Sequence, residues 1–203
     1  MSKKVFAFDL GRVLFDFDIR IALRALGSTS EMSQEKILEA IYYENFGVEY
    51  EKGLITNFEF YKRFSDKFGL KNKYEDFTEA WCGMFSPKNE MIEFVAKLRR
   101  MYPLYMISNI SDLHFEYLFE KYRYVFDYFR GLVLSFKERS VKPEEKIYKT
   151  LETLCGVPRQ DIIYIDDRQD LIEAAEGMGF CSIQFKDLAR LIEDLEKAGI
   201  ALP

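Results

Sequence analysis

The chain has 203 residues, 48% of them hydrophobic and 31% charged, which is the balance of a folded globular protein rather than a disordered one. Its formal net charge is −5, so charge does not favour nucleic acid or an anionic membrane as a partner. Three cysteines without CxxC spacing and a single histidine argue against a disulfide framework, a zinc site and a Ser-His-Asp triad. We therefore expect a cytoplasmic protein that has no targeting segment and no membrane span.

Five short apolar runs predict the strands of one sheet. Each run is continuous rather than alternating, which is typical of parallel strands that are covered on both faces. The runs lie at residues 5–8, 104–107, 132–134, 162–165 and 181–185. Helical patterns separate or follow them at residues 88–101, 111–121, 144–155, 171–178 and 187–197. This alternation predicts an α/β fold built on a doubly wound parallel sheet.

Residues 16–86 interrupt this alternation after the first strand and show no convincing strand pattern. Helical patterns in this segment lie at residues 33–46, 57–68 and 74–84. A crossover between parallel strands needs only about a dozen residues, so the segment is long enough to be a separate unit. We predict a small helical subdomain at residues 16–86, inserted into an α/β core domain made of residues 1–15 and 87–203.

Polar side chains that could take part in chemistry follow the predicted strands. In an open α/β sheet, the carboxyl ends of the strands form the edge at which ligands bind. Three aspartates at that edge would repel one another unless a divalent cation lay between them, and hard oxygen ligands suit Mg²⁺. An aspartate beside a metal can attack phosphorus, while a lysine and hydroxyl or amide donors hold the phosphoryl oxygens. The candidate residues are Asp9, Ser108, Asn109, Lys142, Asp166 and Asp167.

Four segments that contain these residues resemble the signature motifs of the haloacid dehalogenase-like (HAD) superfamily. They are FDLGRVL (8–14), SN (108–109), VKPEEKIY (141–148) and IYIDDRQD (163–170), in the order in which the family has them. Residues 16–86 occupy the position of the family's helical cap. The first motif is most similar to that of the sugar-1-phosphate phosphatase branch, which includes an α-D-glucose-1-phosphate phosphatase. The resemblance implies a Mg²⁺-dependent phosphatase that hydrolyses a small phosphorylated metabolite, such as a sugar phosphate, through an aspartyl-phosphate intermediate.

The resemblance also implies roles for individual residues. Asp9 would be the nucleophile, and Lys142 would neutralise the phosphoryl group and orient Asp9. Ser108 and Asn109 would bind the transferring phosphoryl group. The implied ligands of Mg²⁺ are Asp9, the backbone carbonyl of Gly11, Asp167, and Asp166 directly or through water, with Asp167 the stronger candidate of the last two.

Two positions depart from the family pattern. Most phosphatases of the family have a second aspartate two residues after the nucleophile, which acts as general acid and base, and this chain has Gly11 there. The loss of a general acid typically lowers the rate by about 10²–10⁴-fold, and a good leaving group such as a sugar-1-phosphate or acyl phosphate would reduce this loss. The sugar-phosphatase branch shares the glycine. The second departure is Asp170, which lies three residues after Asp167, whereas the common pattern has an acidic or amide residue four after it, where this chain has Leu171.

Arg12 and His114 are each open to a functional and a structural interpretation. Arg12 could bind phosphate or a substrate carboxylate, or it could form a salt bridge with Asp16 or Asp18. His114 lies in a charged helical pattern, and we predict that it is a surface residue rather than a substrate contact.

A 2-haloacid dehalogenase is the first alternative function. In those enzymes the equivalent aspartate attacks carbon and halide leaves, and neither a metal nor the second aspartate is needed, so Gly11 is compatible with this function. The pair Asp166 and Asp167 argues against it, because adjacent carboxylates without a cation repel each other.

A non-catalytic protein that binds a phosphorylated ligand or another protein through its cap is the second alternative. Gly11 and Leu171 favour this function, since each replaces a polar residue of the family pattern. The presence of Asp9, Lys142 and the aspartate pair argues against it, because a protein under no catalytic demand could lose any of them. No pattern in the sequence favours a particular oligomeric state.

Overall fold

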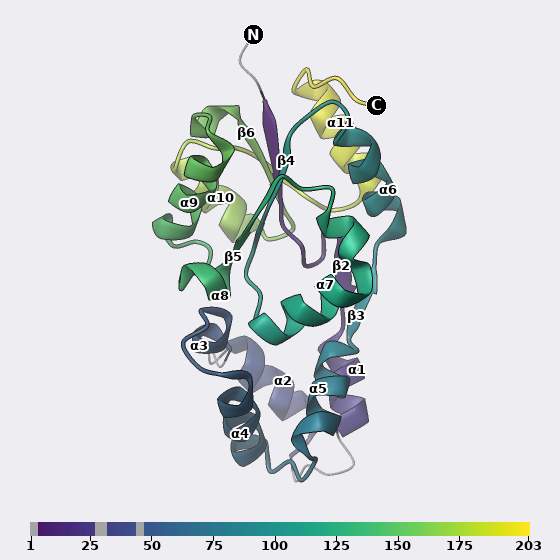
Figure 1. Ribbon diagram of the computed structural model, residues 1–203, viewed down its shortest axis with the longest axis vertical. Coiled ribbons are helices and arrows are strands. Elements are labelled where there is room, and N and C mark those ends of the chain that lie inside the picture. The colour runs from purple at the N-terminus through teal and green to yellow at the C-terminus, as the bar shows by residue number, and fades with distance from the viewer. Residues whose placement is uncertain (1–3, 27–31, 44–46) are drawn as a thin grey trace.

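The computed structural model describes residues 4–26, 32–43 and 47–203. Its main strands are β1 (Val5–Phe8), β4 (Leu104–Ser108), β5 (Gly131–Leu134), β6 (Ile162–Asp166) and β7 (Cys181–Gln184). They form one parallel sheet in the order β5-β4-β1-β6-β7 (Figure 1). The predicted doubly wound α/β sheet and its five strands are therefore confirmed.

Helices cover both faces of this sheet. They are α6 (Asn89–Leu98), α7 (Asp112–Phe126), α8 (Ser135–Glu138), α9 (Glu145–Cys155), α10 (Gln169–Gly177) and α11 (Leu188–Lys197), with a short 3₁₀ helix at Arg159–Asp161. Successive side chains of a strand point to opposite faces. Phe6 and Phe8 pack with α6, α7 and α11 in one hydrophobic cluster, and Val5 and Ala7 pack with α9 and α10 in another. The two helical layers lie on either side of the sheet in Figure 1.

The central strand β1 determines where polar side chains meet. It pairs in parallel with β4 and β6, so that Phe8 lies opposite both Met106 and Ile165. Asp9, directly after β1, donates its backbone N–H to the carbonyl of Ile165 at 2.8 Å. The chain continues from β1 to one side of the sheet and later returns to the other, which makes the carboxyl end of β1 a topological switch point. The ends of β1, β4 and β6 therefore present their residues to the same edge.

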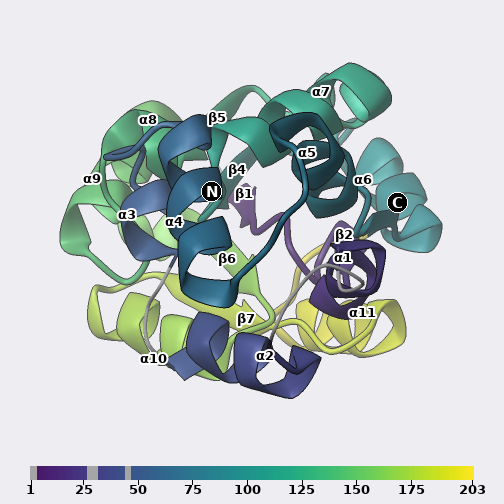
Figure 2. The same ribbon diagram turned by 90° about the horizontal axis from the view of Figure 1, so that it is seen from below.

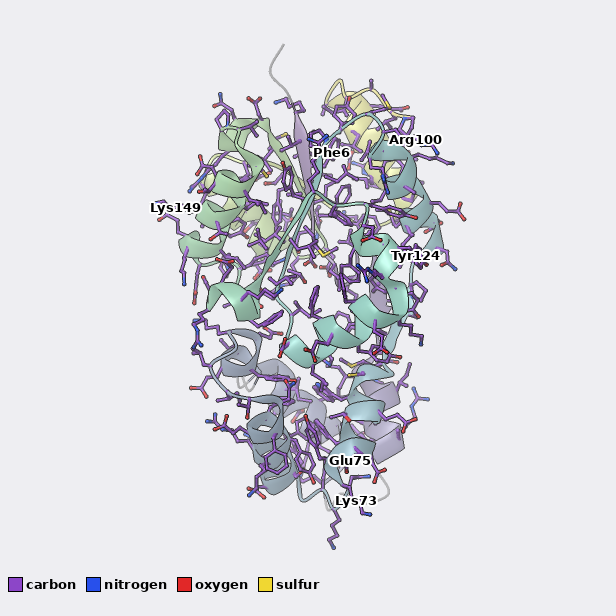
Figure 3. The ribbon with its side chains drawn as sticks, viewed as in Figure 1. Phe6, Lys73, Glu75, Arg100, Tyr124 and Lys149 are labelled. Atoms are coloured by element: carbon purple, nitrogen blue, oxygen red, sulfur yellow. The ribbon has the colours of Figure 1, made fainter. Side chains whose placement is uncertain are left out.

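A helical unit lies beyond this edge. It contains α1 (Ile19–Leu26), α2 (Gln34–Tyr43), α3 (Val48–Glu51), α4 (Asn57–Phe68) and α5 (Tyr74–Cys82). Figure 2 shows α3, α4 and α5 in front of the sheet when the molecule is seen from below. Figure 3 places Phe6 inside the α/β part and Lys73 and Glu75 at the opposite end of the helical unit. Phe60, Phe64 and their neighbours form a separate hydrophobic cluster here, and we propose that residues 16–86 are the cap of a core made of residues 1–15 and 87–203.

Two short strands lie at the ends of residues 16–86, where the sequence shows no convincing strand pattern. The chain leaves and re-enters the core through two short antiparallel strands, β2 (Phe15–Phe17) and β3 (Phe85–Pro87), which pair Phe17 with Phe85. Each strand has three residues, which is too short to produce a periodic pattern in the sequence.

The helices of the cap follow the predicted patterns in part. The predicted helices at residues 57–68 and 74–84 correspond to α4 and α5, and the one at 33–46 corresponds to α2, although its residues 44–46 lie outside the described residues. Helix α1 was missed, although its sequence carried the signal. Its buried side chains recur at helical spacing, at Ile19, Ala22, Leu23 and Leu26.

The cap contacts the core between α3 and α8, which we call the α3–α8 contact. The hydroxyl of Ser135 donates a hydrogen bond to the carbonyl of Glu51 at 2.6 Å, and Lys52 forms an ion pair with Glu144. Gly53 has a φ of +64°, and a Cβ atom at this position would lie 2.6 Å from the carbonyl oxygen of Phe136. Only glycine allows the two backbones to approach so closely in this conformation.

Substitution of Gly53 by alanine tests the α3–α8 contact. Gly156 is a matched control, because it has a φ of +66° and no atom within 4 Å of an added Cβ. Gly156→Ala introduces left-handed backbone strain of about 1–2 kcal/mol. Gly53→Ala adds an overlap with the α8 backbone, and we expect it to lower the free energy of unfolding by at least about 1 kcal/mol more. Urea unfolding of both variants measures the difference, and equal losses would contradict the close approach.

The helices and the cysteines can be compared with the expectations of no membrane span and no disulfide framework. Within the part of the chain that the structure describes, no helix combines the length and the apolar character needed to cross a bilayer. Cys82, Cys155 and Cys181 are free thiols, and burial raises the pKa of Cys82 and Cys155 to about 12. These two thiols are therefore protonated at neutral pH and unsuited to act as nucleophiles.

Candidate active site

A cleft of about 630 Å³ lies between the carboxyl edge of the sheet and the cap. The structure brings all the residues singled out from the sequence to this cleft, namely Asp9, Gly11, Arg12, Ser108, Asn109, Lys142, Asp166 and Asp167. A larger and more open hollow of about 940 Å³ between α1, α5 and α7 contains none of them. The cleft is therefore the candidate active site.

Lys142 is the centre of the hydrogen bonds at the bottom of the cleft. Its ammonium donates to Asp9 Oδ1 at 2.7 Å, to Asp166 Oδ2 at 2.6 Å and to the carbonyl of Ile107 at 3.3 Å. An ammonium has three N–H donors, so all of them are used. Burial lowers the pKa of Lys142, but the two carboxylates outweigh this effect and raise it above its ordinary value. The side chain is therefore a fixed positive charge that joins β1, β4 and β6.

The side chain of Asn109, at the edge of the cleft, is hydrogen-bonded to the backbone of Lys142. Its Oδ1 accepts from the backbone N–H of Lys142 at 2.7 Å, and its Nδ2 donates to the Lys142 carbonyl at 3.1 Å. The amide thereby holds the backbone of residue 142 against the end of β4. Ser108 is buried beside it, and no residue in the described ranges forms a hydrogen bond with its hydroxyl. Ser108 therefore keeps a donor for a ligand in the cleft.

Asp166 and Asp167 differ in their surroundings although they are adjacent. Asp166 is fully buried, and its Oδ2 accepts from both Lys142 and the hydroxyl of Tyr164. Its Oδ1 accepts from the backbone N–H of Arg168 at 3.0 Å. Burial raises the pKa of Asp166, but Lys142 and the other donors bring it below its ordinary value. Asp167 is half-buried and faces the cleft, so it is the more available of the two for a metal.

Tyr164 was not singled out from the sequence. It lies two residues before Asp166 on β6, and residues two apart on a strand face the same side of the sheet. This spacing was the signal that could have identified it.

The donor set at the bottom of the cleft fits a divalent cation. Asp9, Asp166 and Asp167 each offer a carboxylate oxygen, and these oxygens lie within 4.8 Å of one another. Burial raises the pKa of Asp9 to about 7 in spite of Lys142, and burial together with repulsion from Asp166 raises that of Asp167. One ammonium cannot compensate three carboxylates, and hard oxygen donors of this kind suit Mg²⁺.

Gly11 and Arg12 form the turn after Asp9. A Cβ atom on Gly11 would lie 3.1 Å from the ring of Phe17 and 3.9 Å from Asp9 Oδ2, so the turn leaves little room for a side chain there. Arg12 lines the cleft with its guanidinium 4.5 Å from the centre of the Phe17 ring. The alternative that it pairs with Asp16 or Asp18 was wrong, because those carboxylates pair with Lys88 and with Arg24 of α1.

The prediction that His114 is a surface residue was wrong. Its ring lies 5.9 Å from that of Trp81 and 4.9 Å from that of Phe85, measured between centres, and it lines the cleft. Burial lowers the pKa of His114 to about 4, so the imidazole is neutral at pH 7. On the cap side the cleft has an apolar wall, formed by Phe17, Ile19, Val48, Tyr50, Phe60, Trp81, Met84 and Phe85.

A family model described as haloacid dehalogenase-like hydrolase matches residues 3–179. The chain belongs to this family. The match spans all four motifs identified in the sequence, and the resemblance to HAD proteins is thus confirmed. The cleft is accordingly the candidate active site of a HAD hydrolase.

Two relatives that align over most of their length are 25% identical to this HAD hydrolase. The sesquiterpene phosphatase astK of Aspergillus oryzae matches over 190 residues, which cover 91% of this chain and 90% of the relative. A HAD family enzyme of Bacteroides thetaiotaomicron, bt-2542, was solved in complex with magnesium and inorganic phosphate. That structure has a TM-score of 0.82 and covers 94% of this chain and 99% of its own.

An L-2-haloacid dehalogenase of Xanthobacter autotrophicus with covalently bound chloropropionic acid is a more distant structural neighbour. It is 18% identical, has a TM-score of 0.66, and covers 98% of this chain and 85% of its own. At this identity the likeness concerns the fold alone.

Substitution of Lys142 by methionine tests the charge balance of the site. Methionine retains most of the volume but leaves Asp9 and Asp166 buried without a counter-charge. Removing one partner of a buried ion pair costs about 3–5 kcal/mol, and we expect that loss of unfolding free energy for Lys142→Met in urea with EDTA. Lys52→Met breaks a partly exposed pair and is expected to cost about 0–1 kcal/mol. Equal small effects of both variants would show that Asp9 and Asp166 do not depend on Lys142.

Proposed function

We propose that this HAD hydrolase is a Mg²⁺-dependent phosphomonoesterase that acts on a small phosphorylated metabolite through an aspartyl-phosphate on Asp9. The observation that carries the proposal is the cluster of three carboxylates around one fully engaged lysine at the switch point of the sheet. A similar sesquiterpene phosphatase and a similar enzyme with bound magnesium and phosphate support it. Free thiols suit a reducing compartment, and the proposed location is the cytoplasm.

The reaction takes two displacements at phosphorus. An oxygen of Asp9 forms a bond to phosphorus while the bond from phosphorus to the organic oxygen breaks. Lys142 holds Asp9 in place and adds positive charge beside the phosphoryl group, and the Ser108 hydroxyl donates a hydrogen bond to a phosphoryl oxygen. Water then attacks phosphorus, the bond to Asp9 breaks, and inorganic phosphate leaves.

Asp9, Asp167 and the carbonyl of Gly11 would hold Mg²⁺, with Asp166 directly or through water. The ion would supply positive charge for the phosphoryl oxygens and relieve the repulsion between the carboxylates. This arrangement agrees with the exposure of Asp167 to the cleft and with the commitment of Asp166 to Lys142 and Tyr164.

Binding of Mg²⁺ to Asp167 can be measured without turnover. We expect Mg²⁺ to raise the melting temperature of the wild-type protein, because a ligand that binds only the folded state stabilises it. Asp167→Asn is expected to weaken the affinity derived from this shift by at least about tenfold. Asp170→Asn removes an equal charge from the same turn but from a residue paired with Arg168, and it is expected to bind as the wild type does. Equal weakening in both variants would indicate a general charge effect and contradict ligation by Asp167.

The wall of the cleft indicates the kind of organic group that the substrate carries. The core side supplies charges for a phosphate, whereas the cap side is formed by aromatic and aliphatic side chains. The cleft has a volume of about 630 Å³, which lies within the range of about 300–1,000 Å³ that is usual for small-ligand sites. We infer that an aromatic or isoprenoid phosphate fits this wall better than a sugar phosphate, and the relation to a sesquiterpene phosphatase supports this order.

Phosphate release from a panel of monoesters tests the proposed function. The panel contains p-nitrophenyl phosphate, farnesyl phosphate, α-D-glucose-1-phosphate and acetyl phosphate, each with Mg²⁺ and with EDTA. We expect release that requires Mg²⁺ and falls by at least about 10³-fold in Asp9→Asn, because the amide cannot act as the nucleophile. Asp16→Asn is the control, since Asp16 pairs with Lys88 outside the cleft and is expected to retain activity.

Two further assays separate the alternatives, a chloride-release assay and a binding assay with inorganic phosphate. Release of chloride from chloroacetate without metal, in the absence of phosphate release, would identify a dehalogenase. Binding of inorganic phosphate without turnover of any compound would identify a non-catalytic protein.

A further inference from the structure

The site as described lacks a group that protonates the leaving oxygen. Gly11 stands where most phosphatases of the family have an aspartate for this purpose, and the adjacent Phe17 ring leaves little room for a side chain. The aspartates of the core are held in the cluster around Lys142. His114 carries no proton on its second nitrogen at neutral pH, since its pKa is about 4. One carboxylic acid remains among the described residues that line the cleft, and it belongs to the cap.

We infer that this residue, Glu51, donates a proton to the leaving oxygen and then accepts a proton from the attacking water. The inference rests on the proposed phosphatase function and names a catalytic residue that the motifs of the family do not contain.

The location of Glu51 suits an in-line displacement. The attacking and the leaving oxygen lie on opposite sides of phosphorus in such a reaction. Asp9 attacks from the edge of the sheet, so the leaving oxygen points towards the cap. Glu51 lies at the end of α3 on that side, and it lines the same cleft as Asp9 and Lys142.

Hydrogen bonds through Ser135 connect the backbone of Glu51 to the segment after β4, where the phosphoryl group would bind. Its carbonyl accepts from the hydroxyl of Ser135 at 2.6 Å, and the same hydroxyl oxygen accepts from the backbone N–H of Ile110 at 2.9 Å. Ile110 follows Ser108 and Asn109 directly. Two hydrogen bonds therefore connect the cap residue to the segment that holds the phosphoryl group.

The surroundings of Glu51 allow both protonation states near pH 7. Burial raises its pKa to about 7, and the positive charges of Arg168 and Lys142 oppose this rise. Within the described ranges, no side chain forms an ion pair or hydrogen bond with its carboxylate, and α8 faces α3 with the uncharged Ser135 hydroxyl and Phe136 carbonyl. The other ionisable groups at the cleft include Asp9, Arg12, His114 and Asp167.

The proton balance closes with water as the only co-reactant. In the first step the bond from Asp9 to phosphorus forms, the bond from phosphorus to the organic oxygen breaks, and the proton of Glu51 passes to that oxygen to give an alcohol. In the second step water bonds to phosphorus and gives a proton to Glu51, while the bond from phosphorus to Asp9 breaks. Glu51 is protonated again at the end of the cycle.

Glu51→Gln tests the inference in the full-length protein with Mg²⁺. Benzyl phosphate and p-nitrophenyl phosphate have organic groups of similar size, but benzyl alkoxide needs a proton to leave and p-nitrophenolate does not. We expect Glu51→Gln to lower kcat/KM for benzyl phosphate by about 10²–10⁴-fold and that for p-nitrophenyl phosphate by less than about tenfold. Glu49→Gln is the matched control on the same helix, because Glu49 is exposed and pairs with Arg63, and it is expected to change neither value.

The pH profile provides a second readout. A carboxyl group with a raised pKa keeps its proton up to about pH 7 and loses it above that value. We expect kcat/KM of the wild type for benzyl phosphate to fall as pH rises above about 7, and this fall to be absent for p-nitrophenyl phosphate and for Glu51→Gln. Glu51→Asp, which keeps the carboxyl group, is expected to restore part of the activity, and an unchanged urea midpoint shows that the variants fold.

The outcomes distinguish failure of the inference from failure of the proposed function. Equal losses for both substrates in Glu51→Gln would show that Glu51 only binds substrate, and no loss would show that it has no role. Either result would overturn the inference while Mg²⁺- and Asp9-dependent turnover stood. Absence of Asp9-dependent phosphate release in the wild type would overturn both.

Discussion

The three hydrogen bonds of the Lys142 ammonium are the constraint on which the rest of the site depends. They connect Asp9 after β1, the carbonyl of Ile107 in β4 and Asp166 at the end of β6. A lysine buried in this way is stable only with its carboxylate partners, and each carboxylate in turn needs the lysine. The parallel pairing of β1 with both neighbours places the three groups within reach, and the amide of Asn109 holds the backbone of Lys142 in register.

The core and the cap contribute different kinds of side chains to the cleft above this cluster. The core supplies the charged groups, which suit a phosphoryl group and a cation. The cap supplies an apolar wall for the organic group and, in our proposal, the proton for the leaving oxygen. The α3–α8 contact fixes the cap side of the cleft relative to the core side. Gly53 brings the cap backbone against Phe136, and Ser135 joins Glu51 to Ile110.

Much of the core could be predicted from the sequence, whereas the contributions of the cap could not. Continuous apolar runs that end in Asp9, Ser108 or Asp166 identify buried parallel strands and the edge at which they meet. The role of Asn109 as a support for Lys142 depends on hydrogen bonds between segments 33 residues apart, which no local pattern reports. His114 was misplaced for a related reason, since the helical pattern around it contains charged residues such as Asp112 and Glu116, but the rings beside it come from α5 and β3.

Glu51 is the strongest example of a residue that only the tertiary structure identifies. Its helix has four residues, and nothing in VEYE distinguishes the second glutamate from Glu49. The two side chains differ only in what faces them, because Glu49 pairs with Arg63 at the surface and Glu51 turns into the cleft. In the proposed mechanism, Gly11 leaves the core without an acid two residues after Asp9, and the in-line reaction places the leaving oxygen on the cap side. In our proposal a donor on the cap therefore lies where the proton is needed, so that the part of the molecule with the apolar wall also protonates the leaving oxygen.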